Sequence, residues 1–193
     1  RDVAEVLRDT LTRATGVTLE IAADDTPATD YEIVIGKTTR DTEKVVAARK
    51  EIQNDGYAIL VDGTRLYVTG NLPRSGVYGV YTFMEDYLGA RFLSDTYMTV
   101  HDGEVKDIPA DLCRVDSPYF FSRDTYWYHI LHPRRPTKLN IRNAVKSNHW
   151  DMPDLGGGVT YAGRFVHSIW DLAEMEHEIG RQPCLTDETV YET

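Results

Sequence analysis

The sequence predicts a mixed α/β (α+β) fold, in which helices pack on a mixed β-sheet. Helical and strand-like segments alternate along the first 116 residues, which is typical of a sheet covered by helices. A tight hairpin interrupts the alternation, because β-rich runs at residues 57–61 and 65–69 flank Asp62-Gly63, a pair that favours a two-residue turn. Since hairpin strands are antiparallel, we expect a mixed sheet rather than a purely parallel one.

The beginning of the chain is predicted to contain one helix and two strands. A helix over residues 2–15 ends at Gly16, and residues 17–21 alternate like a short strand. A polar loop at residues 24–30 then leads into a strand at residues 31–36, which ends at a glycine. The expected buried face of the helix is formed by Val3, Val6, Leu7 and Leu11.

Two more helices are predicted on either side of the hairpin. The first covers residues 40–53 with Asp41 as its expected N-cap, and the second has Ser75 as its expected N-cap. Short extended pieces come next at residues 98–100 and 104–108. The apolar residues of the second helix recur at helical spacing and share one face: Val77, Val80, Tyr81, Met84 and Leu88.

Three glycines mark the helix that comes after the hairpin. Gly89 stands where a helix commonly ends with a left-handed residue. Gly76 and Gly79 lie inside the helix, where a glycine costs roughly 1 kcal/mol relative to alanine. Two explanations of these glycines are open: they let the helix pack closely on the sheet, or they let an anion or nucleotide approach the start of the helix. The strand-GxGxxG-helix order of a nucleotide site is missing, which favours packing.

Composition argues against several classes of partner and location. The net charge of −10 disfavours a general nucleic-acid binder and attachment to an anionic membrane surface. No apolar run approaches the length of a membrane span. The chain shows no signal segment and does not begin with methionine, so we expect that its natural N-terminus has been removed. Cys113 and Cys184 allow one disulfide without implying it, and their spacing is no metal signature.

The composition changes around Asp116. From Tyr119 onward the chain holds all three tryptophans, eleven of the twenty aromatic residues and five of the six histidines. Such a stretch is typical of the lining of a site, although it could also be an irregular extension over the first domain. Aromatic faces beside planar polar groups suit saccharides, and residues 123–128 and 148–151 have that composition.

Common catalytic and metal motifs are incomplete in this sequence. Residues 34–39 look like the end of a phosphate-binding loop, but the earlier glycine is missing. His177 lacks the second histidine of a zinc-protease helix, and His129 and His132 lack a third ligand. We therefore predict no metal and no cofactor, and we can name no catalytic carboxylate pair.

The order of these segments resembles that of a known accessory domain, and the resemblance is carried by residues 15–16, 33–36, 56–70, 76–91, 118–123, 156–158, 167–168 and 180–186. The first half is similar to the non-catalytic N-terminal domain of glycoside hydrolase family 20 hexosaminidases, the chitobiase or hexosaminidase domain 2 type, and of family 67 α-glucuronidases. A bacterial family of uncharacterised glycoside-hydrolase-like proteins resembles the chain over essentially its whole length.

The resemblance implies two parts. Residues 1–116 would form the accessory domain, and residues 117–193 would begin a (β/α)8 barrel that is incomplete here. Barrel sites are built at the carboxyl ends of the strands, where an arginine of the related hydrolases contacts the sugar; this implies a substrate-binding role for Arg123. Three further substrate-binding residues match only the uncharacterised family: His149, Trp150 and His167.

We therefore expect the N-terminal part of a secreted or cell-envelope bacterial protein that processes a glycan. Its partner in the parent protein would be a carbohydrate, and this chain alone would have no hydrolase activity. The alternative is a non-catalytic carbohydrate-binding or scaffold module, whose aromatic second half folds by itself and binds sugar. A third possibility is a short gene product whose second half pairs with another copy. The glycan, the catalytic residues and the oligomeric state are left open by the sequence.

Overall fold

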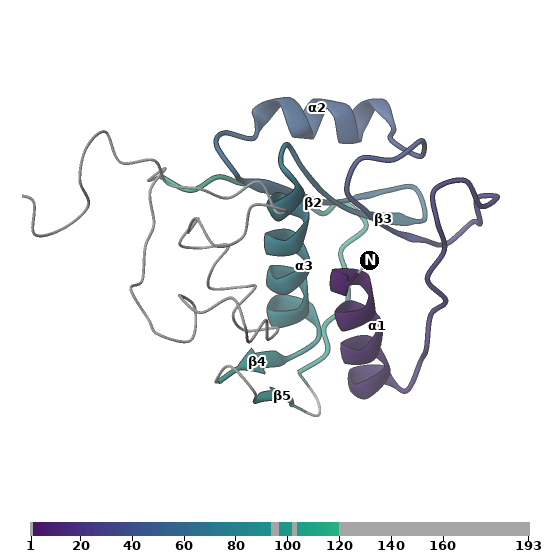
Figure 1. Ribbon diagram of the computed structural model, residues 1–193, viewed down its shortest axis with the longest axis vertical. Coiled ribbons are helices and arrows are strands. Elements are labelled where there is room, and N and C mark those ends of the chain that lie inside the picture. Colours follow the sequence, from purple (N-terminus) through teal and green to yellow (C-terminus); the bar gives the residue numbers. More distant parts are fainter. Residues whose placement is uncertain (1, 94–96, 102–103, 120–193) are drawn as a thin grey trace, which may run out of the picture. The chain divides into compact units, whose positions relative to one another are not determined.

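The computed structural model describes residues 2–93, 97–101 and 104–119 and confirms the mixed α/β class (Figure 1). Its elements are α1 (Asp2–Thr15), β1 (Ile33–Ile35), α2 (Glu43–Glu51), β2 (Tyr57–Asp62), β3 (Arg65–Gly70), α3 (Pro73–Tyr87), β4 (Ala90–Phe92), β5 (Met98–Val100) and β6 (Cys113–Asp116). Among the described residues, one sheet has the strand order β1-β3-β2-β6, and β4 pairs with β5 in a second sheet. β1 is parallel to β3, whereas β2 is antiparallel to β3 and to β6.

Helices cover both faces of the four-stranded sheet (Figure 1). α1 and α3 lie on one face, and α2 lies on the other. The side chains of β2 alternate between two cores: Tyr57 and Ile59 pack with α1 and α3, whereas Ala58 and Leu60 pack with α2. β2 is therefore apolar at consecutive positions because both of its faces are buried.

The structure confirms two of the predicted helices, α1 and α3. α1 has the predicted bounds, and Gly16 ends it with a φ of 77°. Val6 and Leu7 of α1 are buried, and Val3 and Leu11 pack beside them. All five apolar residues predicted for the buried face of α3 are buried, namely Val77, Val80, Tyr81, Met84 and Leu88. Gly89 comes next with a φ of 65°, as expected of a left-handed residue.

Both predicted N-caps were wrong, by one position for α2 and by three positions for α3. α2 is capped by Thr42, whose hydroxyl accepts a hydrogen bond from the backbone N–H of Val45 at 3.4 Å. Asp41, the predicted cap, instead pairs with Arg49 at 2.7 Å. α3 begins earlier than Ser75, because Pro73 suits the first turn. The hydroxyl of Ser75 accepts the backbone N–H of the N-cap residue Leu72 at 3.3 Å.

The predicted hairpin is confirmed, with its turn one residue later than expected. Asp62 pairs with Arg65 in the β2–β3 ladder, so the two loop residues are Gly63 and Thr64. Gly63 has a φ of 61°, a conformation that a residue with a side chain rarely adopts. The strand predicted at residues 31–36 is shorter in the structure, where β1 covers three residues.

The predicted strand at residues 17–21 was wrong. No strand forms there, and Val17, Leu19 and Ile21 are exposed, because no strand of the described residues lies beside them to pair with their backbone. No strand covers residues 104–108 either, although β5 confirms the extended piece at residues 98–100. Two further strands, β4 and β6, were not predicted from the sequence.

The two glycines inside α3 have different surroundings. A Cβ atom at Gly79 would lie 2.5 Å from Val68 Cγ1 and 3.3 Å from Tyr57 Cδ2. Gly79 therefore lets α3 pack against β2 and β3 more closely than any larger residue would. A Cβ atom at Gly76 would meet Ile35 Cγ2 at 3.8 Å, which is an ordinary contact. Close packing thus explains Gly79 but not Gly76.

We expect Gly79→Ala and Gly76→Ala to change stability in opposite directions. Alanine at position 79 collides with Val68, which is fully buried, so the free energy of unfolding should fall by about 1–3 kcal/mol despite the better helix propensity. Alanine at position 76 has room and should raise it by up to about 1 kcal/mol. Urea denaturation followed by circular dichroism measures both. Equal effects of the two substitutions would show that close packing is not the role of Gly79.

Candidate functional site

The four substrate-binding residues predicted from the sequence lie outside the described residues. They are Arg123, His149, Trp150 and His167, and their roles stay predictions. The structure also leaves the pairing of Cys113 untested, since Cys184 lies outside the same ranges. Cys113 itself is on β6 and is exposed.

The described residues contain neither a candidate metal centre nor a candidate membrane span. Among them, no group of three or more His, Cys, Asp and Glu side chains could hold a metal ion. In the same part of the chain, no helix has the length and apolar character needed to cross a membrane. The polar clusters of this part of the chain are built from ion pairs and hydrogen bonds.

One such cluster lies where β2 begins and β3 ends, and we call Asp55, Arg74 and Tyr78 the strand-end cluster. Arg74 Nε is 3.6 Å from Asp55 Oδ2, and the hydroxyl of Tyr78 donates a hydrogen bond to the same oxygen at 3.1 Å. Asp55 is 3% exposed and Arg74 is 5% exposed, so this ion pair is in the interior. Removing one partner of a buried pair leaves the other charge without compensation.

Two glycines bring the backbone segments of this region together. A Cβ atom at Gly70 would lie 2.0 Å from the Cβ of Ser75, so only glycine lets the first turn of α3 come so tightly after β3. A Cβ atom at Gly56 would lie 2.3 Å from the carbonyl oxygen of Asp116. The turn before β2 therefore touches the end of β6, and Asp55 of that turn faces the start of α3.

A second polar group lies beside the first, around Tyr57. The hydroxyl of Tyr57 donates a hydrogen bond to Asp116 Oδ2 at 3.0 Å, and burial of the ring raises the pKa of Tyr57 to about 12. Arg114 lies over the ring, 6.0 Å from its centroid, and bonds Asp86 at 2.6 Å and Asp116 at 3.1 Å. These contacts tie the outer strand β6 to the central strand β2 and to α3.

Ser117 and Pro118, which follow β6, contact the turn before β2. Ser117 accepts a hydrogen bond from the backbone N–H of Gln53 at 2.9 Å, and the amide of Asn54 donates to the carbonyl of Pro118 at 3.3 Å. Gln53 and Asn54 directly precede Asp55, so these contacts lie next in the sequence to the strand-end cluster. Its charges are engaged with each other, which suits structural support rather than acid–base chemistry.

The strand-end cluster was not predicted from the sequence. Asp55 and Arg74 are 19 residues apart, and neither belongs to a motif. A buried ion pair between a turn and a helix has no local pattern, because its partners meet only when the sheet has formed. The one available indication was an arginine directly after Pro73 at the start of an apolar helix, where a cation is unfavourable unless it has a partner.

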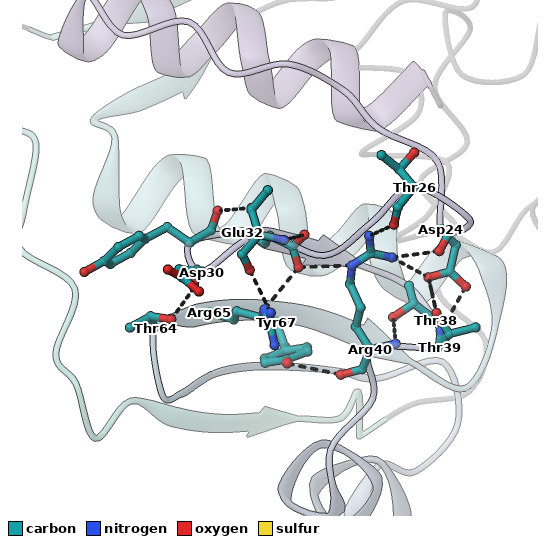
Figure 2. A network of polar contacts seen from close by, with 12 residues as sticks. Asp24, Thr26, Asp30, Glu32, Thr38, Thr39, Arg40, Thr64, Arg65 and Tyr67 are labelled. Carbon is teal, nitrogen blue, oxygen red and sulfur yellow. Dashed lines mark hydrogen bonds and ion pairs between the residues drawn. The ribbon is translucent and has the colours of Figure 1, made fainter.

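A third group, the Arg40 clasp, holds the long loop between α1 and β1 (Figure 2). The guanidinium of Arg40 donates hydrogen bonds to Glu32 Oε2 at 3.0 Å, Asp24 Oδ1 at 2.9 Å and the carbonyl of Thr26 at 2.7 Å. The carbonyl of Arg40 accepts the hydroxyl of Tyr67 on β3 at 3.1 Å. One arginine therefore fastens three points of the loop to the sheet.

The carboxylates of the clasp are stabilised in their charged form. The backbone N–H of Thr39 donates to Asp24 at 2.9 Å and, together with Arg40, holds the pKa of Asp24 below its ordinary value. The backbone N–H of Thr29 donates to Glu32 at 2.9 Å and, with Arg40 and Arg65, does the same for the pKa of Glu32.

Comparison with known proteins finds one similarity, which covers the chain from α1 into α3. The model of the glycosyl hydrolase family 67 N-terminus matches residues 2–83. This match runs from α1 into the last turns of α3. Neither a curated protein nor a solved structure matches the chain. The chain therefore begins with a domain like the N-terminal domain of family 67 glycosyl hydrolases.

We predict that Arg74→Met lowers the free energy of unfolding by about 3–5 kcal/mol, because it leaves Asp55 buried without its cation. Urea denaturation measures the loss. Arg91→Met is the matched control, since the pair of Arg91 with Glu104 is largely exposed and should change the same quantity by less than about 1 kcal/mol. Equal losses in the two variants would contradict a special role of the buried pair.

We also predict an acid-dependent loss of stability from the Arg40 clasp. Because the pKa values of Asp24 and Glu32 are lowered in the folded state, their contribution is present above the ordinary values of 3.8 and 4.5. It is lost as the pH falls below them. Urea denaturation between about pH 6 and pH 3 should show a shallower pH dependence for Asp24→Asn than for the unchanged chain. Asp25→Asn removes the same charge one residue away and should keep the original dependence; a matching change there would refute the clasp.

Proposed function

We propose that this chain is the N-terminal part of a bacterial glycan-processing, glycoside hydrolase-like protein. The observation that carries the proposal is the match of residues 2–83 to the family 67 N-terminus. In this proposal the described domain is a non-catalytic support, and residues 117–193 begin a (β/α)8 barrel whose acid and base residues lie elsewhere in the parent protein. The parent protein would act in the cell envelope or outside the cell, where extended glycans are found.

The described geometry supports a role in holding the next segment of the chain. Both the strand-end cluster and the Tyr57 group use their charged atoms to fasten β6, α3 and the turn before β2 to one another. The contacts of Ser117 and Pro118 hold the residues after β6 against the turn before β2, which supports a second domain that begins there. A domain that begins there starts from a rigid surface rather than from a flexible linker.

The substrate in this proposal is a carbohydrate, and its contacts come from the second half of the chain. Arg123 would hold sugar hydroxyl or carboxylate groups with its planar donors, and Trp150 would stack on the apolar face of a ring. His149 and His167 would add hydrogen bonds. These roles come from the resemblance of the sequence, and they would need the complete barrel to form a tight site.

We predict that the 193-residue chain does not cleave aryl glycosides and does not bind saccharides tightly. A panel of chromogenic α- and β-glycosides, including glucuronides and N-acetylhexosaminides, measures turnover. Calorimetric titration with the matching mono- and oligosaccharides measures binding, for which we expect no Kd below about 1 mM. The physical reason is that a glycosidase needs two placed carboxylates, or one with assistance from the substrate, and a full set of sugar contacts.

Two results would overturn this proposal in different ways. Turnover at an ordinary enzymatic rate would show that the chain is a complete enzyme. Tight saccharide binding without turnover would favour the carbohydrate-binding module instead. In that case Arg123→Ala and Trp150→Ala should abolish binding, whereas Arg8→Ala, at a partly exposed position on α1, should leave it unchanged.

A further inference from the structure

The outer edge of β1 has no partner strand among the described residues, since β1 is the last strand of its sheet on that side. On the inner side, the backbone N–H of Gly36 donates to the carbonyl of Val68 on β3 at 2.8 Å. Successive residues of a strand direct their backbone groups to opposite sides, so those of Ile33 and Ile35 point away from β3. Unpaired N–H and C=O groups of this kind can receive a further strand.

Residues 17–21 have the properties of the strand that this edge lacks. In the described conformation they form no strand and make no backbone–backbone hydrogen bond with another described residue. Their apolar side chains alternate with polar ones and are 40–53% exposed: Val17, Leu19 and Ile21. This period of two is typical of a strand with one buried side. The segment thus leaves exposed both the side chains and the backbone groups that a strand at a sheet edge buries.

The contacts of the loop between α1 and β1 direct this segment toward the carboxyl end of β1. Asp24 accepts the backbone N–H of Thr39, which follows β1, at 2.9 Å (Figure 2). At the amino end of β1, Arg65 Nη2 donates to the carbonyl of Thr29 at 2.7 Å. Since Asp24 comes shortly after residues 17–21, that segment leads to the carboxyl end of β1 and would run parallel to it.

The joint between α1 and this segment permits movement. Gly16 has a φ of 77°, and a Cβ atom there would meet nothing within 4 Å, so the chain is not packed at this residue. Thr18 shares a hydrogen bond of 3.1 Å with Thr12 of α1, between exposed hydroxyls for which water competes. Residues 17–23 reach roughly 23 Å when extended, whereas β1 covers about 10 Å, at ~3.3 Å per residue. The segment therefore has the length to close on β1 while Asp24 stays in the Arg40 clasp.

We propose that residues 17–21 are a strap that closes on the outer edge of β1 as a further strand, parallel to β1. The described conformation is the open one, in which the strap is unpaired. Closing pairs the backbone groups of Ile33 and Ile35, and it covers the apolar side of the strap with the rim of the core to which these isoleucines belong. The closed strap shields β1 from strands of other molecules. The same segment of a second copy is the competing occupant of the edge.

Hydrogen–deuterium exchange of the full chain, followed by mass spectrometry, tests the proposal. The reference is a synthetic peptide of residues 15–24, which has no sheet to pair with. We expect the amides of residues 17–21 to exchange on the order of tenfold more slowly in the chain than in the peptide, because closing protects them. The amides of Ile33 and Ile35 should be protected as well. Exchange of residues 17–21 at the rate of the peptide would show that the strap stays open and would overturn the proposal.

A matched pair of variants separates the strap from an unrelated protection of the loop. Leu19→Asn places an amide on the apolar side of the strap, and it should restore fast exchange both in residues 17–21 and at Ile33 and Ile35. Glu20→Asn places the same side chain on the polar side and should keep the protection. Both positions are exposed, so neither variant disturbs the core, which circular dichroism checks. Protection that survives Leu19→Asn, or that both variants remove equally, would contradict the strap.

The dependence on protein concentration identifies the occupant of the edge. A strap that closes within one molecule gives the same protection at every concentration. Protection that rises with concentration, together with a dimer in light scattering, would assign the edge to a second copy and overturn the proposal. Because the readout contains no sugar, its failure and that of the proposed function are distinguishable.

Discussion

The β2–β3 hairpin is buried on both faces and paired along both edges. The rest of the domain supplies the partner strands and the covering helices that this burial requires. Ile59, Leu60, Tyr67 and Val68 are at most 1% exposed. Buried backbone N–H and C=O groups must find partners, so a hairpin covered on both faces needs a strand on each side. β1 supplies one edge from before the hairpin, and β6 supplies the other from more than 40 residues after it. The helices then cover the two faces that the strands leave apolar.

The polar interior depends on how closely these layers approach. Gly79 sets the distance of α3 from the sheet, and Gly70 lets α3 start immediately after β3. With α3 in that position, Arg74 lies in the interior and needs the carboxylate of Asp55. The buried ion pair therefore depends on the close packing at the two glycines, because a larger side chain there would shift α3 and separate the charges of Arg74 and Asp55. The Arg40 clasp works differently: it lies nearer the surface and holds a loop, so salt and acid weaken it first.

Local patterns in the sequence were enough for much of the fold. The periodicity of Val77, Val80 and Met84 predicted the buried face of α3, because helical neighbours are close in sequence. The caps were misplaced because Asp41 and Thr42 are both good capping residues and only the backbone geometry of the folded chain selects one.

Pairing between distant residues was not predictable in the same way. Residues 17–21 alternate like a strand but have no partner strand. By contrast, β6 begins with the exposed residues Cys113 and Arg114, so nothing in its own sequence marks it as a strand. For the same reason the Asp55–Arg74 pair could not be predicted. The sugar-contacting roles of Arg123, His149, Trp150 and His167 come from a resemblance, and the described residues do not reach them.

The late position of β6 has a consequence for how this domain forms during synthesis. The segment that is similar to the family 67 N-terminus ends at Phe83, yet the sheet is closed only by residues 113–116. From the emergence of Asp62 until that of Asp116, the ribosome adds 54 residues, which takes roughly 3–11 s at ~5–20 residues per second. During that time the apolar strand β2 has an open edge that can pair with other nascent chains. The smallest fragment that avoids this hazard therefore ends at Asp116. A fragment that ends at Phe83 would keep β1, β3 and β2 but leave β2 as an open, apolar edge strand, which favours aggregation.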